Sequence, residues 1–334
     1  MNFIVFIILS FIFSLTSLSS EVITNKNVNF SINFSNFVEV KKSLKKHCKS
    51  NKFLLNLRNH ASYPKFGSYE NWKKVCEKII NTDISHNFIE KYFSTLQFSK
   101  KGILTGYYEP SIKISTERDK DFKFPILKKS KKLEFERKKI IKIFKNKDVL
   151  FWTDNNIDLF FLQIQGSGVG ILQNGEKIMI KYHGHNNHKY TSIGKILVEN
   201  GHIKKEKISM FTIKEWLHKN ILKSEEIMNQ NKRYIFFKKE PYSQESSSGA
   251  MGNTLIAGTS IAIDKSLFPY GIPFLIKTDE NKFNKIVISH DTGSAIKGYN
   301  RADLFTGRGK KAEIIAGNLK KPLQLISLVP YISD

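Results

Sequence analysis

The hydrophobic positions of the chain change their spacing near residue 100. In residues 68–80 (SYENWKKVCEKII), apolar side chains recur every three or four positions, as on the buried face of a helix, with Ser68 as the N-cap. The same spacing runs through residues 86–98 (HNFIEKYFSTLQF). We therefore predict that residues 36–98 are helical and that these apolar faces form core rather than a groove for a partner.

Short apolar runs bounded by glycine, proline and aspartate dominate the rest of the chain and predict strands. The runs before residue 240 are ILTGYYEP, DLFFLQIQGSGVGIL, KIMIKYHG and RYIFFKK, and helical spacing returns over residues 192–231. After residue 253, turn-separated runs favour a small β-barrel over a parallel βαβ sheet. The basic stretch 126–150 predicts a solvated, mobile surface element, with a binding strip for an acidic polymer as the alternative.

These patterns predict a mainly β protein with a helical N-terminal part. Residues 1–20 are apolar, uncharged and followed by small residues near Ser20, which predicts a cleaved export signal. An uncleaved anchor is the alternative, because the run is close to the length that spans a bilayer. No cysteine ends the run, so we expect an exported protein that is not a lipoprotein. The other predicted boundaries are a helical part packing on the barrel at 21–101, a β-rich insert at 102–242, a polar linker at 243–253 and the barrel at 254–334.

The charge of the chain bears on its binding partner, and its cysteine content bears on disulfide formation. The chain carries 54 Lys and Arg against 30 Asp and Glu, a formal net charge of +24. This excess favours a polyanionic partner, and export makes nucleic acid the weakest choice; a solvated surface without a target is the alternative. Cys48 and Cys76 are the two cysteines. Either a disulfide between two N-terminal helices or a pair of buried free thiols fits them.

Two aspartates in residues 288–309 (ISHDTGSAIKGYNRADLFTGRG) are the strongest candidates for chemistry. Asp291 ends a predicted strand, and Asp303 precedes the apolar pair Leu304 and Phe305. Apolar surroundings disfavour an ionised carboxyl and an ionised neighbour adds repulsion, so the pKa of Asp303 is expected to rise toward that of a general acid. Such a pair suits cleavage of a glycosidic bond. The alternative is that both aspartates only cap turns.

Four segments, in order along the chain, resemble the membrane-bound lytic murein transglycosylase A (MltA) family. TGYYEP at 105–110, LQIQGSG at 162–168 and YHGHNNHKYTSIGKIL at 182–197 are similar to its central insert domain. DTGSAIKG, followed by RADLFTGRG and AEIIAG, resembles its C-terminal 3D domain. The resemblance implies a double-psi β-barrel, a second β-rich insert domain and a glycan groove between them.

The resemblance also implies a reaction. Family members cleave the β-1,4 bond between N-acetylmuramic acid and N-acetylglucosamine in peptidoglycan and leave a 1,6-anhydromuramic end. The family's catalytic aspartate falls on Asp303 and its companion on Asp291. Asp303 would protonate the leaving oxygen and then accept the proton of the sugar's own C6 hydroxyl, whose attack has the advantage of proximity. The implied location is the periplasm or cell envelope.

Further side chains in these segments are expected to form the walls of the groove. The tyrosines would present flat faces and hydroxyls to sugars, and the two glutamines, placed on one face of a strand, would present amide groups. Glycine lets the backbone approach a ligand closely. The predicted substrate-binding residues are Tyr107, Tyr108, Gln163, Gln165, Gly166, Ser167 and Lys297.

Three histidines, His183, His185 and His188, raise a metal site as a minor alternative. They lack an acidic residue at ligand spacing and the family needs no metal, so no metal or cofactor is expected. The rival functions are a hydrolase with Asp303 as acid and Asp291 as base for water, and a non-catalytic envelope protein that binds glycans. The expected partners of the chain, itself expected to be a monomer, are peptidoglycan strands and cell-wall synthesis proteins, with no nucleic acid.

Overall fold

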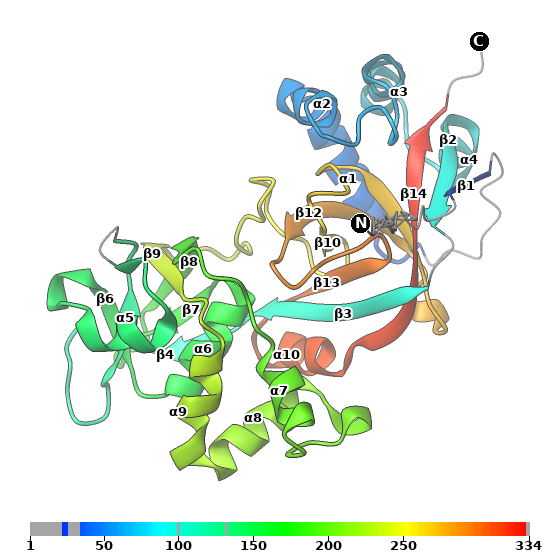
Figure 1. Ribbon diagram of the computed structural model, residues 1–334. Coiled ribbons are helices and arrows are strands. Elements are labelled where there is room, and N and C mark those ends of the chain that lie inside the picture. The colour runs from blue at the N-terminus through cyan, green and yellow to red at the C-terminus, as the bar shows by residue number, and fades with distance from the viewer. Residues whose placement is uncertain (1–21, 26–33, 99–100, 131–132, 332–334) are drawn as a thin grey trace, which may run out of the picture.

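The computed structural model describes residues 22–25, 34–98, 101–130 and 133–331, and the predicted export signal lies outside these ranges. The described chain forms two lobes, and strand β3 (Gly102–Glu109) runs from one toward the other (Figure 1). One lobe holds the N-terminal helices and the C-terminal strands, and the other holds most of the residues between β3 and residue 242. None of the described helices is long and apolar enough to span a bilayer.

A closed ring of strands forms the centre of the first lobe. The strands pair in the order β14, β11, β12, β10, β13 and β3, and β3 pairs again with β14. β14 serves both ends of the ring because its residues 320–323 pair with β3 and its residues 324–327 pair with β11. This ring is the predicted β-barrel, and it includes β3, which the predicted boundary at residue 102 assigned to the insert. Two further strands, β1 and β2, extend this sheet beyond the ring. Besides β3, the strands of the sheet are β1 (Val22–Asn25), β2 (Phe93–Phe98), β10 (Ser260–Ile263), β11 (Pro273–Lys277), β12 (Ile286–Thr292), β13 (Arg301–Arg308) and β14 (Lys320–Pro330).

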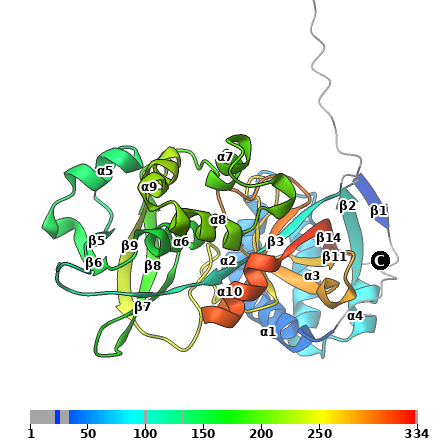
Figure 2. The same ribbon diagram turned by 90° about the horizontal axis from the view of Figure 1, so that it is seen from below.

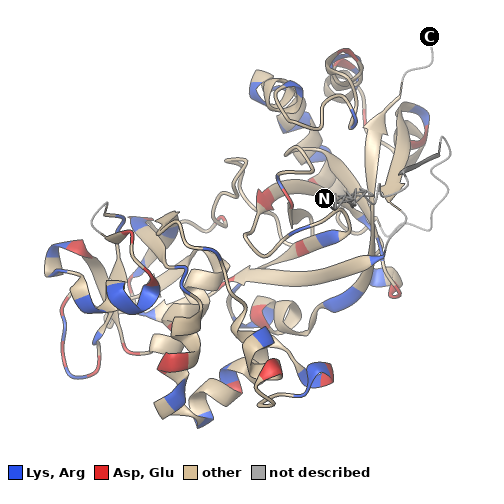
Figure 3. Cartoon of the chain, in the orientation of Figure 1, with Lys and Arg blue, Asp and Glu red and all other residues tan. Residues whose placement is uncertain are grey.

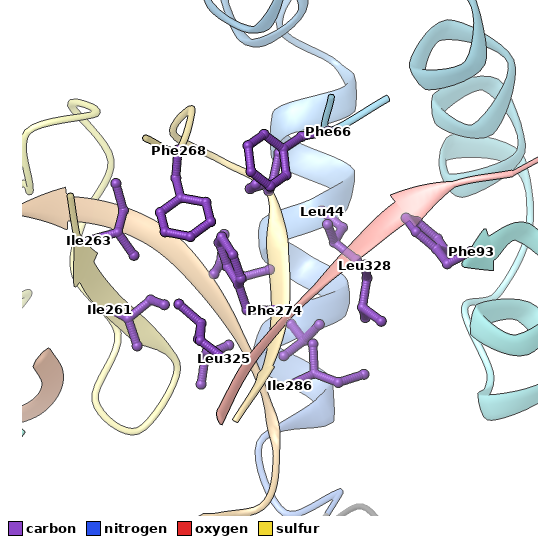
Figure 4. Packing of buried hydrophobic residues seen from close by; sticks show 14 of the residues in the cluster. Leu44, Phe66, Phe93, Ile261, Ile263, Phe268, Phe274, Ile286, Leu325 and Leu328 are labelled. Carbon is purple, nitrogen blue, oxygen red and sulfur yellow. The ribbon is translucent and has the colours of Figure 1, made fainter. Parts of the chain in front are cut away.

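Helices α1 to α4 pack beside the ring and share its core. Leu44 of α1 lies with Phe274, Leu325 and Leu328 of the strands in one buried cluster (Figure 4). Ser68 caps α3 as predicted, since its hydroxyl accepts from the backbone N–H of Asn71. A disulfide joins Cys48 and Cys76, and it ties α1 to α3, which selects the first of the two cysteine alternatives. The helices are α1 (Phe37–Cys48), α2 (Asn51–Arg58), α3 (Tyr69–Asn81) and α4 (His86–Tyr92).

The prediction of helix up to residue 98 is wrong at its end. Helix α4 stops at Tyr92, and residues 93–98 form β2, which pairs with β1 and β14. Phe93 and Leu96 continue the three-residue spacing of the helix, so the apolar pattern alone does not separate the two. Residues 93–98 become a strand because they pair with β14, which lies near the C-terminal end of the chain.

The second lobe contains a four-stranded sheet in the order β4, β7, β8 and β9, a two-stranded sheet of β5 and β6, and several helices. Helices α7 to α9, which confirm the helical signals at 192–231, pack with α6 in a separate apolar cluster. Seen from below, α8 lies next to α10 (Gly309–Asn318) of the first lobe (Figure 2). The elements are β4 (Ser111–Lys113), β5 (Phe124–Leu127), α5 (Arg137–Ile143), β6 (Val149–Thr153), α6 (Asn156–Gln165), β7 (Gly168–Ile171), β8 (Lys177–His185), α7 (Ile193–Glu199), α8 (Met210–Lys219), α9 (Ile221–Gln230) and β9 (Ile235–Pro241).

Two predictions for this lobe are wrong. Residues 158–165, predicted to be strand, lie in helix α6, which is capped by the side chain of Asn155 and ends at Gly166 with a φ of 88°. Most of α6 is buried on all sides, so its apolar residues show no helical period. The basic stretch 126–150 is more than a solvated surface, because its described part contributes α5 and buries Leu127 and Ile140 in a small apolar cluster with Tyr234 and Phe236.

Candidate active site

A groove of about 1230 Å³ lies between the two lobes, and both lobes supply its walls. The first lobe contributes residues of β3, β10, β12 and β13 and the loop after β12, and the insert contributes the end of α6 and parts of β8 and β9. The fold therefore brings together segments that are far apart in the sequence. All of the predicted site residues line this groove, namely Tyr107, Tyr108, Gln163, Gln165, Gly166, Ser167, Asp291, Lys297 and Asp303.

Strand register places the two aspartates in one row across the barrel. Ala262 of β10 is the partner of Asp291 on one side and of Asp303 on the other. Asp303 is in turn paired with Thr105 of β3. Residues that face each other on neighbouring strands point to the same side of a sheet. The two carboxyl groups therefore flank Ala262, which also lines the groove.

Asp303 is held through one of its two carboxyl oxygens. The hydroxyl of Thr105 donates to Oδ1, and Nη1 of Arg301 lies 3.5 Å from the same atom. Nη2 of Arg301 donates to the Thr105 hydroxyl at 2.8 Å and so fixes its direction. Among the described residues no hydrogen bond or ion pair reaches Oδ2, and the side chain is 20% exposed. Burial raises the pKa of Asp303 although Arg301 opposes the rise, so Oδ2 can carry a proton into the groove.

Asp291 differs from Asp303 because the protein uses both of its oxygens. Oδ1 accepts from the backbone N–H groups of Ala250 and Thr292, each at 2.9 Å. Oδ2 accepts from the hydroxyl of Tyr107 at 3.0 Å. Burial raises the pKa of Asp291, these three hydrogen bonds oppose the rise, and the nearby Asp303 adds to it. This arrangement holds a carboxylate in place and leaves it poorly placed to bind a water molecule.

The two tyrosines of β3 have different surroundings because successive strand residues point to opposite faces. Burial and the charge of Asp291 raise the pKa of Tyr107 far above its usual value, so its hydroxyl stays protonated and donates. The side chain of Tyr108 is only 3% exposed and donates to Glu313 Oε1 at 3.0 Å. The expectation that Tyr108 offers a flat face to sugars is therefore wrong, since its ring packs against α10.

The glutamines also act differently from the prediction, because they lie at the end of a helix and not on one face of a strand. Gln163 is 3% exposed and accepts from Nη1 of Arg137 at 2.6 Å. Gln165 accepts from the backbone N–H of Tyr108 at 3.1 Å, which ties α6 to β3. Gly166 has open space where a Cβ would point, and Ser167 accepts from the backbone N–H of Tyr182. These contacts make the segment a shaped edge of the groove.

Lys297 and the three histidines have their own surroundings. Lys297 is paired with Asp264 at 3.2 Å and is 64% exposed at the groove edge. His185 lines the groove and accepts from the backbone N–H of Asn187. Within the described ranges, no group of three His, Cys, Asp or Glu side chains is arranged to hold a metal ion.

Four further residues at or beside the groove were not among the predicted ones. Thr105 and Arg301, which hold Asp303, begin the segments TGYYEP and RADLFTGRG, so their position in these segments was the available signal. Burial raises the pKa of Tyr190, and the charge of Asp303 adds to the rise, which places this residue of the insert near Asp303. Burial and Asp291 raise the pKa of Tyr270 to about 12. Tyr190 and Tyr270 carry no local pattern, and only the fold brings them here.

Comparison with known proteins gives the same two parts. Residues 103–238 match the MltA specific insert domain, and residues 259–329 match the 3D domain; together the two matches cover more than half of the chain. The membrane-bound lytic murein transglycosylase A homolog of Buchnera aphidicola is 35% identical over 245 residues, which are 66% of this chain and 66% of the relative. The membrane-bound lytic murein transglycosylase A of Escherichia coli K12 is 33% identical over 228 residues, or 64% of this chain and 61% of the relative.

A solved structure adds the arrangement in space. The crystal structure of the E. coli MltA with bound chitohexaose superimposes with a TM-score of 0.65 and 26% sequence identity, covering 86% of this chain and 90% of that one. The chain thus spans just under two thirds of the length of the curated relatives while it covers most of the solved fold. With both domain matches, these relatives and the two-lobed fold in agreement, the chain belongs to the membrane-bound lytic murein transglycosylase A family.

Proposed function

We propose that this protein is a lytic transglycosylase that cleaves the β-1,4 bond between N-acetylmuramic acid and N-acetylglucosamine in peptidoglycan and forms 1,6-anhydromuramic ends. The observation that carries the proposal is the difference between the two carboxyl groups beside Ala262. Asp303 keeps Oδ2 open to the groove and has a raised pKa, whereas Asp291 is bound on both oxygens. The family membership supports the same reaction.

In the proposed mechanism Asp303 acts twice. Its protonated carboxyl donates to the glycosidic oxygen, the bond from C1 of the muramic sugar to that oxygen breaks, and the leaving sugar departs with a free hydroxyl. The C6 hydroxyl of the same muramic sugar then attacks C1, and its proton passes to the Asp303 carboxylate. No water is consumed, and Asp303 ends the cycle protonated as it began. Asp291 supplies a fixed negative charge opposite the positive charge that develops at C1.

The hydrolytic rival needs a carboxylate that activates water, and the surroundings of Asp291 argue against this role. Its oxygens already accept from Ala250, Thr292 and Tyr107. A water molecule would have to compete with three hydrogen bonds from groups that the fold holds in place. We therefore assign positioning and electrostatic stabilisation to Asp291, with Tyr107 holding its second oxygen.

This function also implies a substrate, a location and a division into domains. Peptidoglycan strands are the proposed substrate, and the proposed location is the periplasm or cell envelope after export through residues 1–20. The proposed division places the insert at 102–242, although its first strand, β3, pairs within the barrel, the linker at 243–253 and the 3D domain at 254–334. Residues 247–250 of this linker line the groove and bind Glu109 and Asp291, so the linker also contributes to the site.

Mass spectrometry of the soluble products from peptidoglycan sacculi tests the proposal. The wild type should release anhydro-muropeptides, and Asp303→Asn should lower the rate at least about 100-fold because the general acid is lost. Asp83→Asn, which changes an exposed aspartate of the N-terminal part, serves as the matched control and should retain full activity. Products with reducing ends would instead establish hydrolysis, and sacculus binding without any product would support the glycan-binding rival.

A further inference from the structure

The insert side of the groove contains a buried arginine that the proposed reaction does not use. Arg137 lines the groove and is only 5% exposed. Its guanidinium donates to the backbone carbonyls of Asn231 and Arg233, at 3.0 and 2.7 Å, and to Gln163. Among the described residues it forms no ion pair with a carboxylate. Its charge is held by these hydrogen bonds and by the ring faces of Phe160 and Tyr234, 4.8 and 5.2 Å from the guanidinium, and no acidic side chain within the described ranges neutralises it.

Other cations surround the same part of the groove. Arg233 is half-buried, lines the groove and donates to the backbone carbonyl of His188 at 3.0 Å. Lys265 lines the groove from the barrel side, and His185 lines it from β8. The side chain of Lys129 packs against Gly184, since a Cβ added to Gly184 would lie 2.8 Å from Cδ of Lys129. We call Arg137, Arg233 and Lys265 the cationic wall.

The pKa of His185, which lines the groove beside this wall, responds to the positive charges around it. Burial lowers the pKa of His185, and Arg233, Lys129 and Lys265 lower it further. Lysines and arginines are spread over both lobes of the molecule (Figure 3). Arg233 of the insert and Lys265 of the barrel lobe both line the groove.

The acidic residues of the groove are engaged elsewhere. Glu109 is paired with Arg308, and Glu240 is paired with Lys181 and Lys238. The other two acidic groove residues are the aspartates beside Ala262. The cationic wall therefore lacks a counterion within the described part of the chain.

We propose that the cationic wall is a subsite for a carboxylate that projects from the muramic side of the glycan strand, so that the enzyme prefers charged strands over neutral ones of the same backbone. This inference rests on the proposed function for the identity of the strand. The carboxylate has two possible sources, the stem peptide or the lactyl ether of muramic acid. A guanidinium matches the geometry of a carboxylate, and Arg233 is the wall's accessible guanidinium.

Binding measured with the Asp303→Asn protein tests the subsite without turnover. Calorimetry would compare oligosaccharides of equal length: a strand with stem peptides, a peptide-free strand with free lactyl carboxylates, and an N-acetylglucosamine oligomer without carboxylates. We expect at least one charged strand to bind about tenfold more tightly than the neutral oligomer, as one charged hydrogen-bonded contact would give. The lactyl carboxyl is free only in the peptide-free strand, because it forms the amide bond to the stem in the other. Tight binding of the peptide strand alone therefore assigns the stem peptide, tight binding of the peptide-free strand alone assigns the lactyl group, and tight binding of both shows that the wall accepts either carboxylate.

Substitutions in the wall give the decisive result. Arg233→Gln and, separately, Lys265→Gln should remove most of the preference for charged strands and leave binding of the neutral oligomer unchanged. Arg233→Lys should keep part of the preference, and Lys311→Gln, an exposed lysine of α10, should keep all of it. Equal affinity for charged and neutral strands, or a preference that survives both Gln substitutions, would overturn the subsite. A wild type that releases no anhydro products would overturn the proposed function but not this result.

Discussion

At the scale of single residues, the chemistry depends on how Asp303 is held. Arg301 reaches Asp303 both directly and through Thr105, while it also donates to the backbone carbonyl of Ala302 at 2.6 Å. Its positive charge opposes the rise in the pKa of Asp303 that burial causes. Arg301 therefore balances the two roles of Asp303, since a lower pKa reduces the protonated fraction at a given pH and favours the carboxylate that completes the reaction.

Replacing Arg301 by Gln should change the pH dependence of the reaction. Without the guanidinium the pKa of Asp303 rises, so the acid form persists to higher pH, and the alkaline limb of kcat/KM should move to higher pH. We also expect kcat to fall about tenfold, because the Thr105 hydroxyl loses its fixed direction. The measurement is the rate of anhydro-muropeptide release against pH, with the exposed Arg58→Gln as control. An unchanged profile would show that Arg301 serves the fold alone.

The sequence identified residue types at the site better than it identified their contacts. Asp291 and Asp303 could be selected because carboxylates beside glycine turns and apolar residues suggest acid chemistry. Their hydrogen bonds could not be predicted, because Tyr107, Ala250 and Thr105 arrive from other parts of the chain. Tyr108 illustrates the limit, since strand alternation turns it toward α10 and the sequence does not say which face is the groove.

At the scale of elements, the spacing of apolar residues predicts a helix or strand correctly where only one face of the element is buried. Helix α3 has this pattern and was predicted together with its cap. Helix α6 is buried on most sides, and β2 depends on pairing with β14, so both were assigned wrongly. The spacing of apolar residues indicates which face of an element is buried. An element that is buried on all sides, or that is fixed by a strand from a distant part of the chain, therefore has no distinctive spacing.

A chain of hydrogen bonds joins helix α1 to the barrel. With both imidazoles neutral, His47 donates through Nδ1 to the carbonyl of Gly271, and His290 donates through Nε2 to Nε2 of His47, at 3.1 and 3.2 Å. The Ser260 hydroxyl donates to Nδ1 of His290 at 2.7 Å and accepts from the backbone N–H of Ile256. Every polar atom of the chain is then satisfied. An added proton would have no acceptor between the rings, and burial lowers the pKa of His47 to about 4 and that of His290 to about 3.

This chain should make the fold sensitive to acid. Both folded-state pKa values lie below the ordinary value of 6.5, so the stabilisation is present above pH 6.5 and is lost as the pH falls toward 4. Each imidazole should lower the free energy of unfolding by about 1.4 kcal/mol per pH unit within that window. Denaturant titrations from pH 7 to 4.5 measure this slope.

Two variants separate this effect from other titrating groups. The double variant His47→Leu, His290→Leu should be less stable at pH 7 and should show a flatter slope. The exposed His218→Gln should keep the wild-type slope. The raised pKa values of Asp291 and Asp303 act in the opposite direction, since protonation of these groups favours the folded chain. A double variant with the wild-type slope would show that other groups carry the pH dependence.

At the scale of the whole molecule, the groove exists because the chain leaves the barrel at β3 and returns through residues 242–247. Glu109 and Arg308 lie where these two connections meet. Glu109 is 3% exposed at its side chain, pairs with Arg308 at 2.9 Å and accepts from the backbone N–H of Ser247. Arg308 also donates to the carbonyls of Ser243 and Glu245, at 2.7 and 2.8 Å. One ion pair thus fixes both connections between the lobes.

Removing one partner of this pair should destabilise the protein and loosen the groove. Arg308→Met leaves the Glu109 carboxylate buried and unpaired, which we expect to cost about 3 kcal/mol or more in the free energy of unfolding. Glu109→Gln should cost less, because its neutral amide can still accept from Ser247. The double variant Glu109→Gln, Arg308→Met should recover part of the loss, since no unpaired charge remains, whereas simple additivity of the two effects would contradict coupling through the ion pair. Residues 243–247 lose their anchor in both Arg308 variants, so KM for peptidoglycan strands should rise even in the double variant. Urea unfolding measures the loss of stability, and the rate of product release against substrate concentration measures the change in KM.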